Sequence, residues 1–261
     1  MCKWVEMVNR PELPNKPLIE ALFEYKWKIP DDKIDSNYQL FVGKLYNKLE
    51  AQYPFYQPLD LSAFPPGIVK YQVAHRFRKA ENIWPIVQVG HGVVTLNNDH
   101  NYTWPDFEKR IYELFDSIYS TYPEPAGLQV QSMSLRYRDA FDLQKDEEAL
   151  IYMKKYLKSE IKLPNSLFDD ASIASNPKII NSFVVYDVLE PKGQISLKFS
   201  SGMHNNVPSL IMDTCFSSQS NELTNIPHNF KDWLNSAHQL TDSWFFKLID
   251  GELLEGFSNA K

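Results

Sequence analysis

The sequence has little cysteine and no long uninterrupted apolar run. Its 261 residues include two cysteines, Cys2 and Cys215, which lie far apart in the chain. Two distant cysteines do not form a disulfide framework, so we expect a reducing, cytoplasmic environment. No stretch of about 18 apolar residues occurs, so we expect no membrane span. The start of the chain also lacks the apolar segment of a signal peptide.

An excess of basic charge is absent as well. The chain carries 27 Lys and Arg against 33 Asp and Glu, which gives a formal net charge of −6. This balance argues against proteins that bind nucleic acid or a membrane surface, so we expect neither as a partner. The composition is nevertheless 43% hydrophobic and 14% aromatic, which is sufficient for a sizeable buried core.

Motifs for catalysis and metal binding are missing too. No HxH, HExxH or Cys/His cluster occurs, and there is no G-x-S-x-G nucleophile motif. The acidic pairs stand at expected helix starts or in loops, where they favour capping over acid–base chemistry. We therefore expect no metal site and no cofactor. The six histidines are His75, His91, His100, His204, His228 and His238, and the acidic pairs are Asp31–Asp32, Glu147–Glu148 and Asp169–Asp170.

The sequence does contain segments in which apolar residues recur with a clear period. Two-residue alternation predicts strands, and apolar residues at helical spacing predict helices. A cap at Thr103, with Pro105 after it, marks the start of the second helix. The predicted strands are 18–29, 68–80, two within 83–98, 130–141, 178–189, 193–203 and 208–218. The predicted helices are 35–53, 101–122, 145–160 and a closing helix 227–257 that is broken near Gly251.

The order of these elements divides the chain into two similar halves. Residues 1–123 and 124–261 each give β-α-β-β-β-α, either by internal duplication or by chance. We expect an α+β fold in which antiparallel sheets are each backed by helices on one face, with the halves packed as one globular unit. The open sheet face, or the groove between the halves, is the expected binding surface.

The stretch IWPIVQVGHGVVTLNN, residues 83–98, places His91 between two glycines. A phosphate-binding loop would require a helix immediately after it, but the pattern here continues as a strand. We therefore predict a hairpin with a three-residue loop, in which the glycines supply positive φ angles and His91 lies at an exposed tip.

Four arginines alternate with core residues on two predicted strands. Arg76 and Arg78 flank Phe77, and Arg136 and Arg138 flank Tyr137. They are expected on one sheet face, where guanidinium groups suit carboxylates and phosphates. The alternative is a solvated face whose arginines pair with Glu20, Glu24 or Asp139, each pair contributing at most about 1 kcal/mol. Elsewhere, His238 is either a base or a packed histidine, and Cys215 lies in an apolar strand pattern that indicates an inert core thiol.

Five stretches together resemble a known group of proteins. They are PLIEALFEYKW, WPIVQVGHGVVTLN, YTWPDF, LRYRDAF and FKDWLNSAH, spread over nearly the whole chain. They resemble a sporadically distributed bacterial family of conserved hypothetical proteins of similar length. The resemblance implies a cytoplasmic bacterial protein, such as an accessory of a mobile or defence locus, and it brings no catalytic residue with it. Its most specific residues are Tyr102, Trp104, Phe107, Leu135, Arg136, Tyr137 and Asp139. At Arg138 the chain departs from the family, whose members often have a hydrophobic residue there.

The same residues can also have purely structural roles. Tyr102, Trp104 and Phe107 can hold their helix on the sheet, Leu135 and Tyr137 face the core, and Arg136 can tie the two halves through a carboxylate. We favour a non-catalytic binding protein with a protein partner or a second copy. One alternative is an enzyme acting on a small anionic or nucleotide-like ligand, and another is a structural subunit of a larger complex. The candidate ligand-binding residues are Arg76, Arg78, Arg136, Asp139 and His238.

Overall fold

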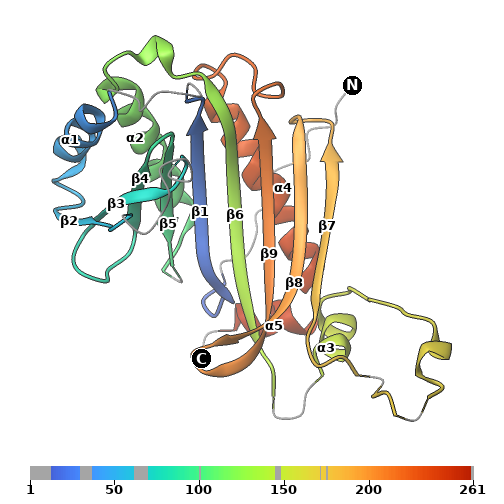
Figure 1. Ribbon diagram of the computed structural model, residues 1–261. Coiled ribbons are helices and arrows are strands. Elements are labelled where there is room, and N and C mark those ends of the chain that lie inside the picture. Colours follow the sequence, from blue (N-terminus) through green and yellow to red (C-terminus); the bar gives the residue numbers. More distant parts are fainter. Residues whose placement is uncertain are drawn as a thin grey trace.

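A computed structural model describes residues 13–29, 37–61, 70–99, 101–144, 148–170, 172–174 and 176–259. Within these residues the strands form a single nine-stranded antiparallel sheet in the order β2-β3-β4-β5-β1-β6-β9-β8-β7 (Figure 1). The α+β class is confirmed. The strands are β1 (Leu18–Trp27), β2 (Phe55–Pro58), β3 (Val73–Arg78), β4 (Ile86–Gly90), β5 (Val93–Asn98), β6 (Val130–Asp142), β7 (Asn181–Val188), β8 (Gly193–His204) and β9 (Val207–Gln219).

The helices α1, α2, α3 and α4 bury apolar side chains against the same face of this sheet, and α5 packs beside them. In Figure 1, α4 runs behind β9 and β8, while α1 and α2 lie beside β2–β5. The ring of Phe115 on α2 stacks on that of Phe230 on α4, with centroids 3.6 Å apart. The helices are α1 (Tyr38–Leu49), α2 (Trp104–Thr121), α3 (Ala149–Tyr156), α4 (Phe230–Ile249) and α5 (Glu252–Ser258), with short 3₁₀ turns η2 (Pro125–Gly127) and η3 (Asn165–Phe168).

The alternation in the sequence explains which side chains reach this helical layer. On β1, Phe23 and Tyr25 are 0% exposed and face the helices, whereas Glu24 lies between them on the opposite face. On β6, Leu135 is likewise 0% exposed, and its neighbour Arg136 points the other way. The sheet therefore has one apolar face against the helices and one polar face without a helix in the described chain.

The two halves share one sheet rather than forming one each. They meet where β1 pairs with β6, and outward from this pair the strands run β1-β5-β4-β3 on one side and β6-β9-β8-β7 on the other. The element order β-α-β-β-β-α is only approximate. The first half has an additional strand, β2, which the periodicity did not predict, and the second half closes with two helices.

The glycines around His91 do form a hairpin, but it is tighter than predicted. Gly90 pairs directly with Val93, so the loop has two residues, and Gly92 has a φ of 80°. Gly90 is required for a different reason, since a Cβ there would lie 1.9 Å from the backbone oxygen of Gln72. The ring of His91 packs edge-on against Tyr38 at 5.3 Å, so the exposed tip was a wrong prediction.

The helix ends agree in part with those predicted from the sequence. The closing helix is broken at Gly251, whose φ of 106° suits glycine, as predicted. Thr103 is the N-cap of α2, but its side chain makes no capping hydrogen bond. The predicted start of the first helix, at residues 35 and 36, lies outside the described residues. No helix in the described segments is long and apolar enough to cross a membrane.

Candidate functional site

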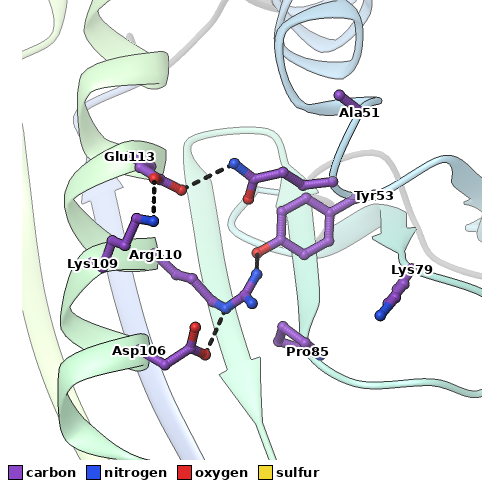
Figure 2. Close-up of a pocket in the computed structure, with 9 residues that line it drawn as sticks. Ala51, Tyr53, Lys79, Pro85, Asp106, Lys109, Arg110 and Glu113 are labelled. Atoms are coloured by element: carbon purple, nitrogen blue, oxygen red, sulfur yellow. Dashed lines mark hydrogen bonds and ion pairs between the residues drawn. The ribbon is translucent and has the colours of Figure 1, made fainter.

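A pocket of about 300 Å³ lies between the end of α1 and the first half of α2 (Figure 2). Most of its polar groups pair with one another. Arg110 Nε donates to Asp106 at 2.7 Å and Arg110 Nη1 donates to the Tyr53 hydroxyl at 3.3 Å. Gln52 donates to Glu113 at 3.0 Å. None of these residues was a candidate from the sequence, and their mutual pairing leaves little charge for a ligand.

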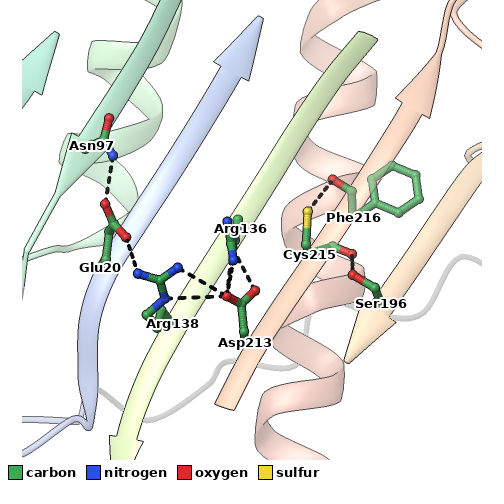
Figure 3. A network of polar contacts seen from close by, with 8 residues as sticks. All are labelled: Glu20, Asn97, Arg136, Arg138, Ser196, Asp213, Cys215 and Phe216. Atoms are coloured by element: carbon green, nitrogen blue, oxygen red, sulfur yellow. Dashed lines mark hydrogen bonds and ion pairs between the residues drawn. The ribbon is translucent and has the colours of Figure 1, made fainter. Parts of the chain in front are cut away.

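The helix-free face of the sheet carries a continuous chain of polar side chains. Gln88 donates to Asn97 at 3.0 Å, and Asn97 donates to Glu20 at 2.8 Å. Glu20 then accepts a hydrogen bond from Arg138 at 3.2 Å (Figure 3). These contacts link six adjacent strands through Arg76, Gln88, Thr95, Asn97, Glu20, Arg138, Asp213 and Arg136.

All four predicted arginines project from this face, but their environments differ. Arg136 binds both carboxylate oxygens of Asp213, with Nε–O distances of 2.7 and 2.9 Å. This hydrogen bonding to Asp213 raises the pKa of the Arg136 guanidinium. Arg138 lies between Glu20 and Asp213. Arg76 and Arg78 stand on β3, separated from β6 by three strands, with no ion pair to another described residue.

The partners of these arginines correct two predictions. We expected Arg136 to tie the halves together, but Arg136 and Asp213 both belong to the second half. The contact between halves is made by Arg138 and Glu20. Of the predicted partners, Glu20 does neutralise an arginine, whereas Glu24 pairs with Lys26 at 2.7 Å. Asp139 pairs with none of the four arginines, because its side chain points to the helical face.

Replacing Asp213 with asparagine should lower the free energy of unfolding by about 1–3 kcal/mol. The Asp213 side chain is 9% exposed and contacts two guanidinium groups; Arg136 would lose its counter-ion, and Arg138 would keep only Glu20. Urea unfolding measures this. The control is Glu24→Gln on the same face, whose pair with Lys26 has both side chains about a quarter exposed and should change stability by less than about 1 kcal/mol. Equal losses in the two variants would contradict the interpretation.

On the helical face, a second polar cluster joins α2, β6 and α4. The hydroxyl of Tyr137 lies 3.1 Å from the hydroxyl of Tyr102 and 3.1 Å from Nδ1 of His238. The His238 ring stacks on Trp104 with centroids 3.6 Å apart. Four residues that the sequence singled out separately, Tyr102, Trp104, Tyr137 and His238, therefore meet in one place.

Burial sets the protonation states in and beside this cluster. It lowers the pKa of His238 to about 3, so the imidazole is neutral and can accept the Tyr137 proton in a hydrogen bond. Asp139 is 2% exposed, and burial, assisted by the negative charge of Asp213, raises its pKa to about 8. Burial likewise raises the pKa of the Tyr137 hydroxyl. The cluster is thus largely uncharged at neutral pH.

The candidate ligand-binding residues do not converge on one pocket. Arg76, Arg78 and Arg136 lie on the helix-free face, whereas Asp139 and His238 lie on the helical face. An enzyme that uses Arg136 together with His238 requires both side chains on one side of the sheet, and this geometry is absent. Phe107 and Leu135 are both 0% exposed and belong to the core.

The other chemical candidates have ordinary surroundings. Cys215 points to the polar face beside Arg136, not into the core as predicted, and burial raises the pKa of its thiol to about 12. His204 contacts Asp142 at 3.2 Å, and His75 contacts the Tyr56 hydroxyl at 2.8 Å. Among the described residues, no three His, Cys, Asp or Glu side chains are grouped to hold a metal. Cys2, Asp31, Asp32, His100 and Glu147 lie outside the described residues.

The edge strand β7 is apolar and exposed, which was not expected from the sequence. It pairs with β8 on one side, and no described strand pairs with its other side. Phe183 is 62% exposed and Tyr186 is 57% exposed, and Val184 and Val185 between them are exposed as well. Further exposed apolar residues precede or follow the strand in sequence, namely Leu163, Leu167, Ile173, Ile179, Leu189 and Met203. An apolar run of this kind predicts a strand, but it does not say that one edge stays open.

Comparison with known proteins adds no assignment to these surfaces. No protein-family model matches the chain, and no curated protein matches it significantly.

Proposed function

We propose that this chain is a non-catalytic interaction protein that assembles through the free edge of β7. The observation that carries the proposal is an eight-residue edge strand whose central residues are apolar and exposed. Proteins normally protect such edges with lysine, proline, a bulge or a short strand, because an open edge pairs with other chains. The opposite edge, β2, shows this protection, since it has four residues and ends at Pro58.

The direction of the backbone groups defines how a partner strand would bind. Ile180 accepts a hydrogen bond from the Ser201 amide of β8, so the even-numbered residues of β7 turn their amide and carbonyl groups inward. Phe183, Val185 and Asp187 consequently turn theirs toward the open edge. These groups are available to an added strand without disturbing the β7–β8 ladder.

The favoured partner is a second copy of this chain, related by a two-fold axis at Val185. Antiparallel pairing about this axis places Val185 opposite its own copy and Phe183 opposite Asp187 of the second chain. Asp187 is the one charged residue of β7, and in this arrangement it does not face itself. Val185 then meets Val185 on one face and Val184 meets Tyr186 on the other, so the centre of the joined strands is apolar, while Phe183 meets Asp187 at the ends.

The substitution Val185→Pro should convert the dimer to a monomer without unfolding the chain. The amide of Val185 points outward, so proline removes a group needed for pairing but none that bonds to β8. Light scattering after size-exclusion chromatography measures the mass. Val185→Thr retains the amide and the branched shape and should remain dimeric. A second variant, Val185→Lys, should also be monomeric because lysine protects edges.

A monomeric wild-type chain at high concentration would overturn the proposed pairing. So would a Val185→Pro variant that keeps both the dimeric mass and the circular dichroism of the wild type. Loss of the dimer in Val185→Thr to the same extent would show that the strand's side chains are not matched as proposed. Each of these results tests only the pairing of β7 and no other surface of the chain.

We also propose a bacterial, cytoplasmic setting and an origin of the two halves by internal duplication. The family resemblance and the small number of cysteines support the setting. The matching strand orders on the two sides of the β1–β6 pair support the duplication. Within such a setting, an assembling protein of this kind suits an accessory role or a structural subunit of a larger complex.

A further inference from the structure

Among the described residues, the two arginines of β3 have no counter-ion, whereas the arginines of β6 do. Arg76 Nε donates to the neutral side chain of Gln88 at 3.0 Å. Arg78 is 8% exposed, and its buried Nε has no hydrogen-bond partner. In the described part of the chain, no carboxylate forms an ion pair with either residue. A buried guanidinium without a counter-ion is energetically unfavourable, so this arrangement requires a compensating group.

The surrounding ladder positions supply no negative charge. Arg76 is flanked by Gln57 on β2 and Gln88 on β4, and Arg78 is flanked by Phe55 and Ile86. Among the paired strands, β1 is the nearest one that carries acidic side chains on this face, and it lies three strands from β3, a distance of about 14 Å. This exceeds the Debye length of about 8–10 Å at physiological salt, so those carboxylates neutralise the two arginines only weakly.

The arginines of β6 have a structural role, and carboxylates of the neighbouring strands neutralise them. Arg138 faces Glu20 on one side and Asp213 on the other, at directly paired ladder positions. On β3 the equivalent positions carry amide and apolar side chains. Burial and the positive charge of Arg76 also lower the pKa of the Arg78 guanidinium, as expected for two neighbouring cations.

We propose that Arg76 and Arg78 form a binding site for a doubly charged oxyanion, the phosphate group of a small phosphate monoester. Two guanidinium groups at alternate positions of one strand match a dianion in charge and present several parallel donors to its oxygens. A phosphate monoester carries close to two negative charges at neutral pH, whereas a carboxylate carries one. The amide groups of Gln57 and Gln88 offer neutral donors on either side.

The site is separate from the proposed assembly edge. The strand β3 is second from one edge of the sheet, and β7 forms the other edge. Failure of phosphate binding therefore leaves the pairing of β7 unaffected, and a monomeric chain can still bind phosphate.

Isothermal titration calorimetry with inorganic phosphate and with O-phospho-L-serine tests the site, with acetate as the singly charged comparison. The full chain should bind both phosphate compounds at one saturable site and acetate at least tenfold more weakly. Arg76→Gln and Arg78→Gln should each weaken phosphate binding at least tenfold. Lys198→Gln removes one positive charge from the same face on β8 and should bind as the wild type does.

Three results would overturn the proposal. They are no saturable phosphate binding by the wild type, binding within twofold of the wild type in both arginine variants, and acetate binding as tight as phosphate binding. Circular dichroism and thermal unfolding of each variant establish that it is folded. If Arg78→Gln is unfolded, Arg76→Gln carries the test, because Arg76 is more exposed and bonds only to Gln88 among the described side chains.

Discussion

Replacing Phe107 with alanine is expected to lower the free energy of unfolding by about 3–5 kcal/mol. Phe107 lies in the first turn of α2 and is 0% exposed. Its ring packs edge-on against Tyr102 at 5.3 Å, next to the point where Tyr102 meets Tyr137. The helices and the sheet enclose this side chain, so its removal leaves a cavity that the neighbours fill only partly. Guanidinium-induced unfolding measures the loss.

The matched control is Leu40→Ala on α1. Leu40 is a large apolar residue on a helix, but it is 52% exposed and lies away from both proposed binding surfaces. Its truncation should change stability by about 0.5 kcal/mol or less. If the two variants lose similar amounts of stability, Phe107 does not anchor α2 to the sheet in the way described.

The variant Asp139→Asn should be more stable than the wild type at alkaline pH. The carboxyl group of Asp139 has a pKa of about 8 in the folded chain, against 3.8 for an ordinary aspartate. Between these two pKa values the folded state holds a proton that the unfolded state releases, so the wild type loses stability as pH rises from about 4 to about 8, and the loss levels off above pH 8. Asparagine has the same shape and no charge. The difference should reach an upper bound on the order of 5 kcal/mol at pH 9.

Chemical unfolding between pH 6.5 and 9 isolates this contribution. His238 has the opposite effect, because its folded pKa of about 3 removes stability only as pH falls below its unfolded value of 6.5. Asp142→Asn serves as the control on the same strand, since that side chain is 48% exposed and its variant should follow the wild-type curve. If the curves of Asp139→Asn and the wild type run parallel across this range, the buried carboxyl group is not protonated in the folded chain.

Periodicity predicted much of the architecture because it depends on neighbouring residues. The alternation in β1 and β6 correctly separated core side chains from polar ones, and it placed the four arginines on one face. The same rule could have separated Arg136 from Asp139, which are three residues apart and therefore face opposite sides of a strand. Grouping them as one ligand site disregarded this alternation.

Other features had weak or misleading local signals. The strand β2 is short and ends in proline, so its propensity is low, and it forms because β3 offers an edge to pair with. The apolar run of β7 resembles a buried strand, and nothing within it indicates that β7 ends the sheet. The pocket beside Arg110 combines residues that follow α1, residues of α2, and the segment between β3 and β4. No local sequence pattern connects these segments.

The sequence by itself determined the strands other than β2, the helices, the hairpin at Gly90–Gly92, the break at Gly251 and the two faces of β1 and β6. These features follow from backbone preferences and from the two-residue and 3.6-residue periods. Only the tertiary structure decided the strand order, the pairing of Arg136 with Asp213, the meeting of Tyr137 with His238, and the lack of a counter-ion for Arg76 and Arg78 among the described residues. Those features depend on contacts between residues far apart in the chain, whose register is set by the packing of the whole sheet.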